Sequence, residues 1–303
     1  MSDSEELGDD LGMEGTGRQK IRTFDVVVTE VIRETADTST IVLFAGGQKI
    51  PYLAGQFITI RPEQFPALER FCAFFRDVKG KPEPPRAYSL YSSPHEADLS
   101  FTVKAEEYVS GLTEYPPLLS PFLTYRLTPG TRMTVRGIGG PYAMDRSVEE
   151  QTDHVVHICA GSGIVPNMSM IKWALATDLN VHHTLIYGNK TWSDIIYRKE
   201  LEELEKQHPD KLRVLHTISR EKDVSRYGAN YRVGRVGEEM ISEVIRDPNA
   251  VAVFTCGPAI TPWDRKAAKA KGVEPTPRFL ETTLAALKAI GLPKDRLHRE
   301  SYG

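Results

Sequence analysis

Apolar and polar positions follow two different rhythms along this chain, and the change falls near residue 150. In the first part, short β-branched runs between 23 and 60 are separated by glycine-containing turns, a pattern typical of antiparallel strands. Further strands are predicted at 86–91, 99–104 and 131–136. The stretch 62–85 is rich in proline and charge, and we expect a surface excursion there. Because no long amphipathic helix pattern interrupts the series, this half is predicted to be a small antiparallel β-barrel.

After Asp153, buried-strand runs alternate with helical patterns through short loops. The predicted strands are 155–158, 181–187, 212–218, 251–255 and 296–302, and the predicted helices are 167–176, 193–207, 238–246 and 278–290. Ser193 is expected to cap the second of these helices at its N-terminus, and Gly291 to end the last one. Strands that alternate with helices in this way predict an α/β domain with a doubly wound parallel sheet.

Composition is that of a soluble globular protein: 303 residues, 40% hydrophobic and 26% charged. The length favours two domains, and we predict a disordered acidic tail at 1–20, a β-barrel domain at 21–148 and an α/β domain at 149–303. The tail holds six acids and two basic residues, so 36 basic and 35 acidic residues remain. That balance predicts no nucleic-acid partner. Since neither a membrane-spanning run nor a signal peptide is recognisable, we expect a cytoplasmic protein without membrane contact, and a monomer.

Cysteine and histidine usage argues against a metal centre. Cys72, Cys159 and Cys256 stand far apart, and three thiols are too few for an iron–sulfur cluster. Their sparse, odd number indicates a reducing compartment. Five histidines fall on or beside predicted strands without carboxylates at metal-ligand spacing, and are predicted to be structural: His154, His157, His182, His183 and His216. We therefore predict no metal.

A glycine-rich loop at 161–166 follows the first strand of the α/β half. Glycines let the backbone approach an anion closely, and the free N–H groups of a helix N-terminus favour a phosphate. Pro166 takes the place of the third glycine in the usual dinucleotide fingerprint, and proline suits a first helical turn. A tight turn without a ligand is the alternative. The residues assigned to the loop are Gly161, Ser162, Gly163, Ile164 and Pro166.

The ends of the next two strands bear on the choice of nucleotide. No acid follows the second strand at Tyr187, where a common NAD-binding fold places its ribose-binding carboxylate. The third strand ends at Ser219 and Arg220, and Arg235 follows. A hydroxyl beside guanidinium groups suits a phosphomonoester such as the adenosine 2′-phosphate of NADPH, so NADPH is favoured over NADH. A solvated basic loop is the alternative.

Taken together, several motifs in order resemble those of the ferredoxin–NADP reductase family, from about residue 22 to the end. The motifs are Arg86-Ala87-Tyr88-Ser89, Thr102-Val103-Lys104, Ser120 at a helix start, the 161–166 loop, Cys256-Gly257-Pro258 and the ending Glu300-Ser301-Tyr302. Two stretches, 62–85 and 259–277, are longer than the family pattern. The resemblance implies an FAD-binding barrel followed by a nicotinamide-nucleotide-binding α/β domain.

The resemblance also implies roles for individual residues. Arg86 neutralises the FAD pyrophosphate, Tyr88 packs against the flavin or its ribityl chain, and the Ser89 hydroxyl reaches flavin N5. Ser120 receives the pyrophosphate. The implied FAD contacts are Arg86, Ala87, Tyr88, Ser89, Thr102, Val103, Lys104, Ser120 and Tyr302. The Tyr302 ring covers the isoalloxazine until nicotinamide displaces it.

On the nucleotide side, the resemblance places Cys256 beside the nicotinamide carbon that carries the hydride. The implied NADP contacts are Gly161, Ser162, Gly163, Ile164, Pro166, Ser219, Arg220, Arg235, Cys256, Gly257 and Pro258. The implied catalytic residues are Ser89, Cys256, Glu300 and Tyr302. Glu300 as an ordinary strand charge, and Cys256 as an inert buried thiol, are the alternatives.

The predicted function is that of an FAD-dependent enzyme that passes electrons from NADPH, or NADH, to a ferredoxin or flavodoxin serving an oxygenase or a P450. The basic run 265–271 is a candidate docking patch for such an acidic carrier. Three alternatives stay open: a noncatalytic electron-transfer subunit of a larger complex, a free-flavin reductase and a flavin-free binding module.

Overall fold

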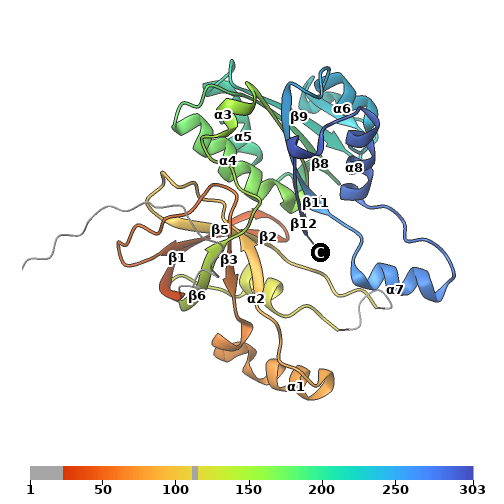
Figure 1. Ribbon diagram of the computed structural model, residues 1–303. Helices are drawn as coiled ribbons and strands as arrows, with labels where there is room; N and C mark the ends of the chain where they lie inside the picture. The colour runs from red at the N-terminus through yellow and green to blue at the C-terminus, as the bar shows by residue number, and fades with distance from the viewer. Residues whose placement is uncertain (1–22, 111–114, 303) are drawn as a thin grey trace, which may run out of the picture.

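Two six-stranded sheets make up the molecule, one antiparallel and one parallel (Figure 1). The computed structural model describes residues 23–110 and 115–302, and the predicted acidic tail lies outside them. Both predicted fold classes, an antiparallel barrel and a doubly wound α/β sheet, are confirmed. The first sheet ends at Gly139 and the second begins at His154.

The first sheet is a barrel with the strand order β4-β3-β6-β1-β2-β5. Leu90, directly after β4, pairs with Phe101 of β5 and so joins the two edges of the sheet. Its core holds the inward side chains of every strand, such as Ile41, Ile58 and Val135. The elements of this half are β1 (Thr23–Thr35), β2 (Thr38–Phe44), β3 (Phe57–Ile60), α1 (Glu69–Lys79), β4 (Arg86–Ser89), β5 (Leu99–Lys104), α2 (Leu119–Tyr125) and β6 (Arg132–Gly139).

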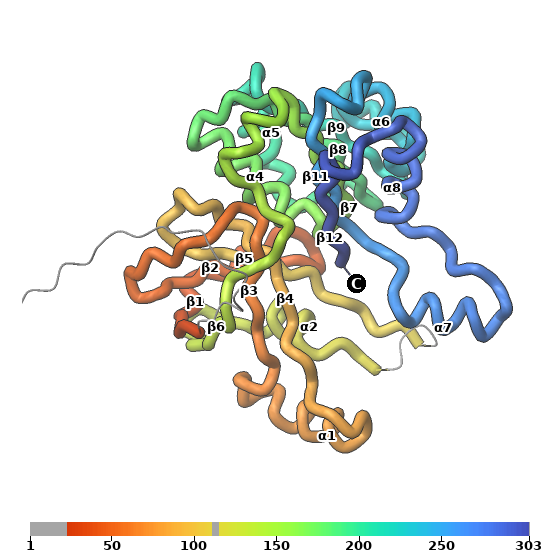
Figure 2. Tube along the Cα trace, in the orientation of Figure 1, coloured from red at the N-terminus to blue at the C-terminus, as the bar shows by residue number. Residues whose placement is uncertain are grey.

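A helix in the excursion 62–85, which we call the arm, contradicts the expectation that this half has no such helix. Helix α1 buries Cys72 and Phe75, while Phe71 and Phe74 stay 56% and 57% exposed. The expectation was wrong because apolar residues at helical spacing lie inside a proline-rich and charged stretch. In Figures 1 and 2 the arm extends from the barrel away from the α/β half.

The second sheet has the order β10-β9-β8-β7-β11-β12, with every neighbouring pair parallel. The chain builds outward from β7 through β10 and then returns to the other side of β7 with β11. The elements are α3 (Val148–Gln151), β7 (His154–Ala160), α4 (Ile164–Ala176), β8 (His182–Asn189), α5 (Arg198–Gln207), β9 (Leu212–Ile218), β10 (Tyr231–Val233), α6 (Glu238–Val244), β11 (Val251–Pro258), α7 (Pro262–Ala270), α8 (Phe279–Ala289) and β12 (Leu297–Tyr302).

Helices cover both faces of this sheet. Helices α4 and α5 pack on one face through side chains such as Ile171 and Leu201, and α6 and α8 pack on the other through Ile241 and Leu287. The reversal of strand order therefore lies between β7 and β11. In doubly wound sheets, ligands bind beside the carboxyl ends of the strands at such a reversal.

The start of α5 differs from the expected helix boundary, and the end of α8 agrees with it. Ser193 does not cap α5: Thr191 and Asp194 form a capping box on a short 3-10 turn, and α5 starts only after Tyr197. Tyr197 has a φ of 58°, which breaks the helix the pattern predicted as continuous. Gly291, with a φ of 82°, follows α8 as expected.

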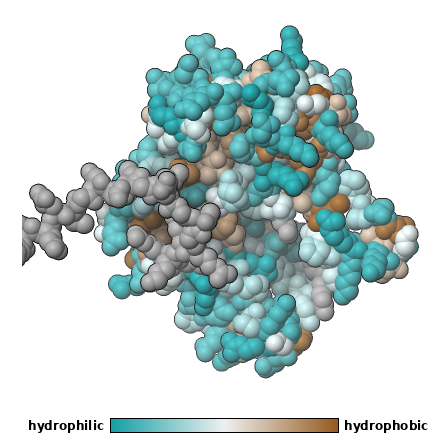
Figure 3. All heavy atoms as spheres, in the orientation of Figure 1, coloured by the Kyte–Doolittle hydropathy of each residue, from teal (hydrophilic) through white to brown (hydrophobic). Residues whose placement is uncertain are grey.

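The second long stretch, 259–277, contains helix α7. Thr261 caps it by accepting from the Asp264 backbone, and Pro262 occupies the first turn, where proline is well tolerated. In Figure 1 α7 projects from the α/β half as the arm does from the barrel. The face in Figure 3 is mostly hydrophilic, with hydrophobic residues in small separate groups. Among helices of the described residues, none has the length and apolar character needed to cross a bilayer.

Polar contacts join the two halves. The Ser93 hydroxyl donates to the Ser169 carbonyl at 2.7 Å, and the Ser169 hydroxyl donates to the Ser92 carbonyl at 2.6 Å. Lys172 of α4 is paired with Glu96 at 3.0 Å. These bonds hold α4, and with it the glycine-rich loop that precedes it, against the barrel.

Candidate active site at the reversal of strand order

The glycine-rich loop touches the end of β11. A Cβ added to Gly163 would lie 2.0 Å from the Cys256 carbonyl oxygen, so this position accepts only glycine without a shift of the backbone. Gly161 has a φ of 54°, in the left-handed region that glycine adopts at little cost. The structure thus brings together the 161–166 loop and the Cys256-Gly257-Pro258 motif. Ile164 and Pro166 of the loop are buried in the first turn of α4.

Strand β12 places two further predicted residues beside that loop. Its register sets Glu300 opposite Cys256 and Tyr302 opposite Pro258. From the barrel, Ser89 at the end of β4 reaches the same place, where its hydroxyl is hydrogen-bonded to the Tyr302 hydroxyl. Ser89, Cys256, Glu300 and Tyr302 therefore form one cluster, built from both halves. Their catalytic roles stay predictions.

Burial dominates the electrostatics of this cluster. It raises the pKa of Glu300 to about 7, against the opposing effect of a hydrogen bond from Ser89. Burial also raises the pKa of the Cys256 thiol well above its ordinary value, with the Glu300 charge adding to the effect. Cys256 is therefore a neutral thiol, and not a thiolate nucleophile.

The cluster suits the edge of a polar ring system. Glu300 Oε2 is buried without a hydrogen-bond partner, and such an atom is costly unless a ligand or water satisfies it. Ser89 is only 3% exposed, and its hydroxyl is hydrogen-bonded to Tyr302. A planar ring that bonds to the Ser89 hydroxyl would compete with Tyr302 for it, and the role of Tyr302 as a movable cover stays a prediction.

At the other end of β4, Arg86 and Ala87 are exposed. Within the described residues Arg86 has no ion-pair partner, so it fits a pyrophosphate. The Tyr88 ring is half-buried against Phe101, with 5.7 Å between ring centroids. The four residues of this motif thus lie along β4, with the unpaired Arg86 at one end and Ser89 in the buried cluster at the other.

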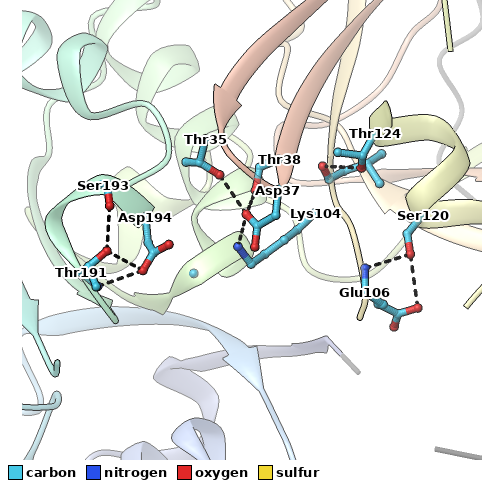
Figure 4. Close-up of polar contacts among 12 residues, drawn as sticks. Thr35, Asp37, Thr38, Lys104, Glu106, Ser120, Thr124, Thr191, Ser193 and Asp194 are labelled. Carbon is cyan, nitrogen blue, oxygen red and sulfur yellow. Dashed lines mark hydrogen bonds and ion pairs between the residues drawn. The ribbon is translucent and has the colours of Figure 1, made fainter. Parts of the chain in front are cut away.

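Other predicted FAD contacts are engaged within the protein (Figure 4). Lys104 is paired with Asp37 at 2.5 Å, and Val103 is buried in the barrel core. The Thr102 hydroxyl lies 2.8 Å from that of Thr40 and is also hydrogen-bonded to the Tyr197 hydroxyl. A role for 102–104 in binding FAD remains a prediction.

Ser120 also has a protein partner. Its hydroxyl accepts from the Glu106 backbone at 3.2 Å and donates to the Glu106 carboxylate at 3.3 Å (Figure 4). Motif reasoning missed Glu106, and no signal in the sequence pairs it with Ser120. A carboxylate at this point would repel a phosphate, so the pyrophosphate contact assigned to Ser120 stays a prediction.

The predicted 2′-phosphate residues lie just beyond the carboxyl ends of β9 and β10. Ser219, Arg220 and Arg235 are exposed, and the Ser219 hydroxyl donates to the Asn189 carbonyl at 3.2 Å. Two neighbouring arginines form ion pairs with acidic side chains: Arg226 with Glu221 and Arg232 with Glu243. Arg220 and Arg235 have no ion-pair partner among the described residues, which leaves them available to an anion.

Further polar residues at this edge were missed from the sequence. The Asn189 side chain is buried, and neither its amide oxygen nor its nitrogen has a partner among the described residues. The Thr217 hydroxyl beside it is likewise buried and unsatisfied. The position of Asn189 at the end of a parallel strand was the available signal. Both residues fit the hydroxyls or phosphates of a nucleotide.

A stacked aromatic pair borders the same edge. The rings of Trp192 and Tyr227 lie 5.2 Å apart at 12°, and the Arg198 guanidinium lies 3.9 Å from the Trp192 centroid. Glu221 holds this pair by accepting from the Trp192 backbone at 2.6 Å and from the Tyr227 hydroxyl at 2.7 Å. The loop that carries Arg220 is thereby fixed in place.

Comparison with known proteins agrees with this geometry. Residues 157–261 match the family model described as "Oxidoreductase NAD-binding domain". The glycine betaine monooxygenase reductase subunit of Chromohalobacter salexigens is 27% identical over 289 residues, which cover 95% of this chain and 65% of that protein. Ferredoxin–NADP reductase of Thermosynechococcus vestitus is 28% identical, covering 90% of this chain and 70% of that protein.

Among solved structures, the FAD/NAD-binding domain of nitric oxide dioxygenase from Vibrio cholerae superposes with a TM-score of 0.67 at 21% identity. The match covers 92% of this chain and 98% of that domain, and it shows the fold. The chain spans less than two thirds of the length of the glycine betaine monooxygenase reductase subunits that it matches. The predicted resemblance to the ferredoxin–NADP reductase family is confirmed.

Proposed function

We propose that this relative of the ferredoxin–NADP reductases is an FAD-dependent NAD(P)H oxidoreductase that passes electrons to a one-electron carrier protein. The observation that carries the proposal is the contact of Ser89, from the barrel, with Tyr302 of the α/β half, next to Cys256 and the glycine-rich loop. A group held by the barrel and a nucleotide held by the α/β half would meet at this point.

FAD, when bound, supplies a centre that accepts a hydride and releases electrons one at a time. Arg86 would pair with its pyrophosphate, and Tyr88 would flank its ring system. The Ser89 hydroxyl would donate to the edge of the ring. Glu300, with its pKa near 7, holds or releases a proton at the Ser89 hydroxyl, and the neutral Cys256 thiol keeps charge and water away from the reacting face.

For the reductant we propose NADPH in preference to NADH. The loop 161–166 offers backbone N–H groups to the nucleotide pyrophosphate. Ser219, Arg220 and Arg235 offer a hydroxyl and two unpaired guanidinium groups to the 2′-phosphate. Asn189 adds an unsatisfied amide at the same edge.

For the acceptor we propose a ferredoxin or flavodoxin that serves an oxygenase or a P450. Glycine betaine monooxygenase reductase is one relative whose name points this way. Helix α7 and the residue that follows it expose four basic side chains: Arg265, Lys266, Lys269 and Lys271. An acidic carrier is attracted to such a surface, which raises its association rate.

The proposal is tested with the purified full chain, NADPH, and either ferricyanide or a ferredoxin as acceptor. We expect FAD to stay with the chain through gel filtration, and both acceptors to be reduced. Loss of FAD with reduction of added flavin would identify a free-flavin reductase instead. Retained FAD without NADPH or NADH turnover would identify a noncatalytic subunit.

A further inference from the structure

A cavity of about 540 Å³ lies where the arm meets the start of β4. Its walls include Lys79, Lys81 and Pro82 of the arm, Arg86 of β4, and Tyr115 of the segment before α2. This volume lies in the range of small-molecule sites, about 300–1,000 Å³. Arg86 thus belongs both to the predicted FAD motif and to a cavity that the long arm creates.

One of these cations is structural. Lys79 is paired with Glu83 at 2.5 Å, and Glu83 is almost fully buried. The Lys79 ammonium also lies 4.2 Å and 4.5 Å from the ring centroids of Phe75 and Tyr115. These contacts neutralise its charge and fix the arm against Tyr115, so the cavity is held in shape by the protein.

The other two cations are free to bind a ligand. Lys81 and Arg86 are exposed, and neither has an ion-pair partner in the described part of the chain. An ammonium and a guanidinium at one cavity suit phosphate oxygens. Tyr115, whose ring already contacts Lys79, also lines the cavity, so the cavity places two free cations next to an aromatic side chain and matches a ligand with phosphate next to a flat ring.

The positions of Arg86 and Ser89 along β4 indicate which ligand fits the cavity. Arg86 and Ser89 are three positions apart on one strand, roughly 10 Å. A cofactor whose ring lies at Ser89 and whose first phosphate lies at Arg86 continues toward the arm. We propose that the arm binds the AMP half of FAD, with Lys81 on the phosphates and Tyr115 beside the adenosine. This inference rests on the proposed function, and it gives the arm a role.

The test measures the dissociation constants of FAD, FMN and riboflavin for the flavin-free full chain by quenching of flavin fluorescence. Lys81→Glu is expected to weaken FAD and FMN by about tenfold or more, because both carry phosphate, and to leave riboflavin unchanged. Tyr115→Ala is expected to weaken FAD alone, because only FAD carries adenosine. Arg70→Glu, on α1 but outside the cavity, is the matched control and should bind all three like the wild type.

Two failures are distinguishable. If the wild-type chain binds FAD, but Lys81→Glu and Tyr115→Ala bind it equally well, the arm has no part in the site and the inference is overturned while the proposed function stands. If the wild-type chain binds none of the three flavins, the proposed function itself is overturned.

Discussion

The hydroxyl of Tyr302 on the last strand is hydrogen-bonded to the hydroxyl of Ser89, which lies 213 positions earlier in the chain. This bond joins the end of the parallel sheet to the end of a barrel strand. Because hydrogen bonding from Ser89 also lowers the pKa of Glu300, Ser89 links both residues of the last strand to the barrel. Binding of a ring at Ser89 and protonation of Glu300 are therefore coupled.

The raised pKa of Glu300 makes stability depend on pH. The folded carboxyl keeps its proton up to about pH 7, above its ordinary pKa of 4.5. The folded state then binds more protons than the unfolded state within this window, so the contribution of Glu300 is fully present below about pH 4.5 and is lost as the pH rises through 7. Glu300→Gln removes this dependence, and the melting temperature of the variant relative to wild type should rise across the window by on the order of a few degrees.

Thermal unfolding at several pH values checks this expectation, with Glu239→Gln, an exposed site on α6, as the control. A constant difference between Glu300→Gln and wild type from pH 4.5 to 8 would show that Glu300 titrates alike in the folded and unfolded states.

Gly163→Ala tests the contact between the loop and β11. An added methyl would lie 2.0 Å from the Cys256 carbonyl oxygen, so the loop must move. We expect a loss of about 1–3 kcal/mol in the free energy of unfolding and a higher KM for NADPH. Gly237→Ala is the control, because its nearest atom would be 3.9 Å away. Urea unfolding and steady-state kinetics provide the readout, and wild-type values for Gly163→Ala would refute the close approach.

Arg220→Ala tests the nucleotide preference. The substitution removes a cation that only the 2′-phosphate needs, so the KM for NADPH should rise by about tenfold or more while that for NADH changes little. Arg232→Ala is the control, since Arg232 is exposed but already paired with Glu243 at 2.7 Å. Equal losses with both nucleotides would remove the basis for assigning Arg220 to the 2′-phosphate.

Lys269→Glu tests the docking role of α7. Reversal of an exposed charge there should raise the KM for an acidic carrier, more at low than at high ionic strength, because salt screens surface charges. Ferricyanide reduction by NADPH should be unchanged. Lys206→Glu on α5 is the matched control. Unchanged carrier kinetics in Lys269→Glu would exclude α7 as the docking surface.

Much of the fold could be predicted because each strand carries its own signal. The strands at 99–104 and 212–218 have the predicted bounds, since their apolar runs end where the strands end. Helix α1 could not be predicted in this way, because its apolar residues lie inside a proline-rich and charged stretch and two of them, Phe71 and Phe74, stay exposed. The start of α5 depends on the left-handed backbone of Tyr197, whose ring stacks on Tyr91 at 4.5 Å, a contact no local pattern encodes.

Within the site, residues at strand ends were accessible to sequence reasoning and their partners were not. Ser89, Cys256 and Glu300 belong to short motifs, and the parallel pairing of β11 with β12 brings Cys256 and Glu300 together. The bond between Ser120 and Glu106 depends on how two loop segments pack, and motifs are silent about it. The same holds for the cavity between Arg86 and the arm.

The most direct test of the account is the visible absorbance of the purified full chain under anaerobic conditions, before and after addition of NADPH and, in parallel, NADH. We expect a flavin spectrum that NADPH bleaches faster than NADH does. A colourless protein that takes up no FAD when FAD is supplied, or a bound flavin that neither nucleotide bleaches, would contradict it.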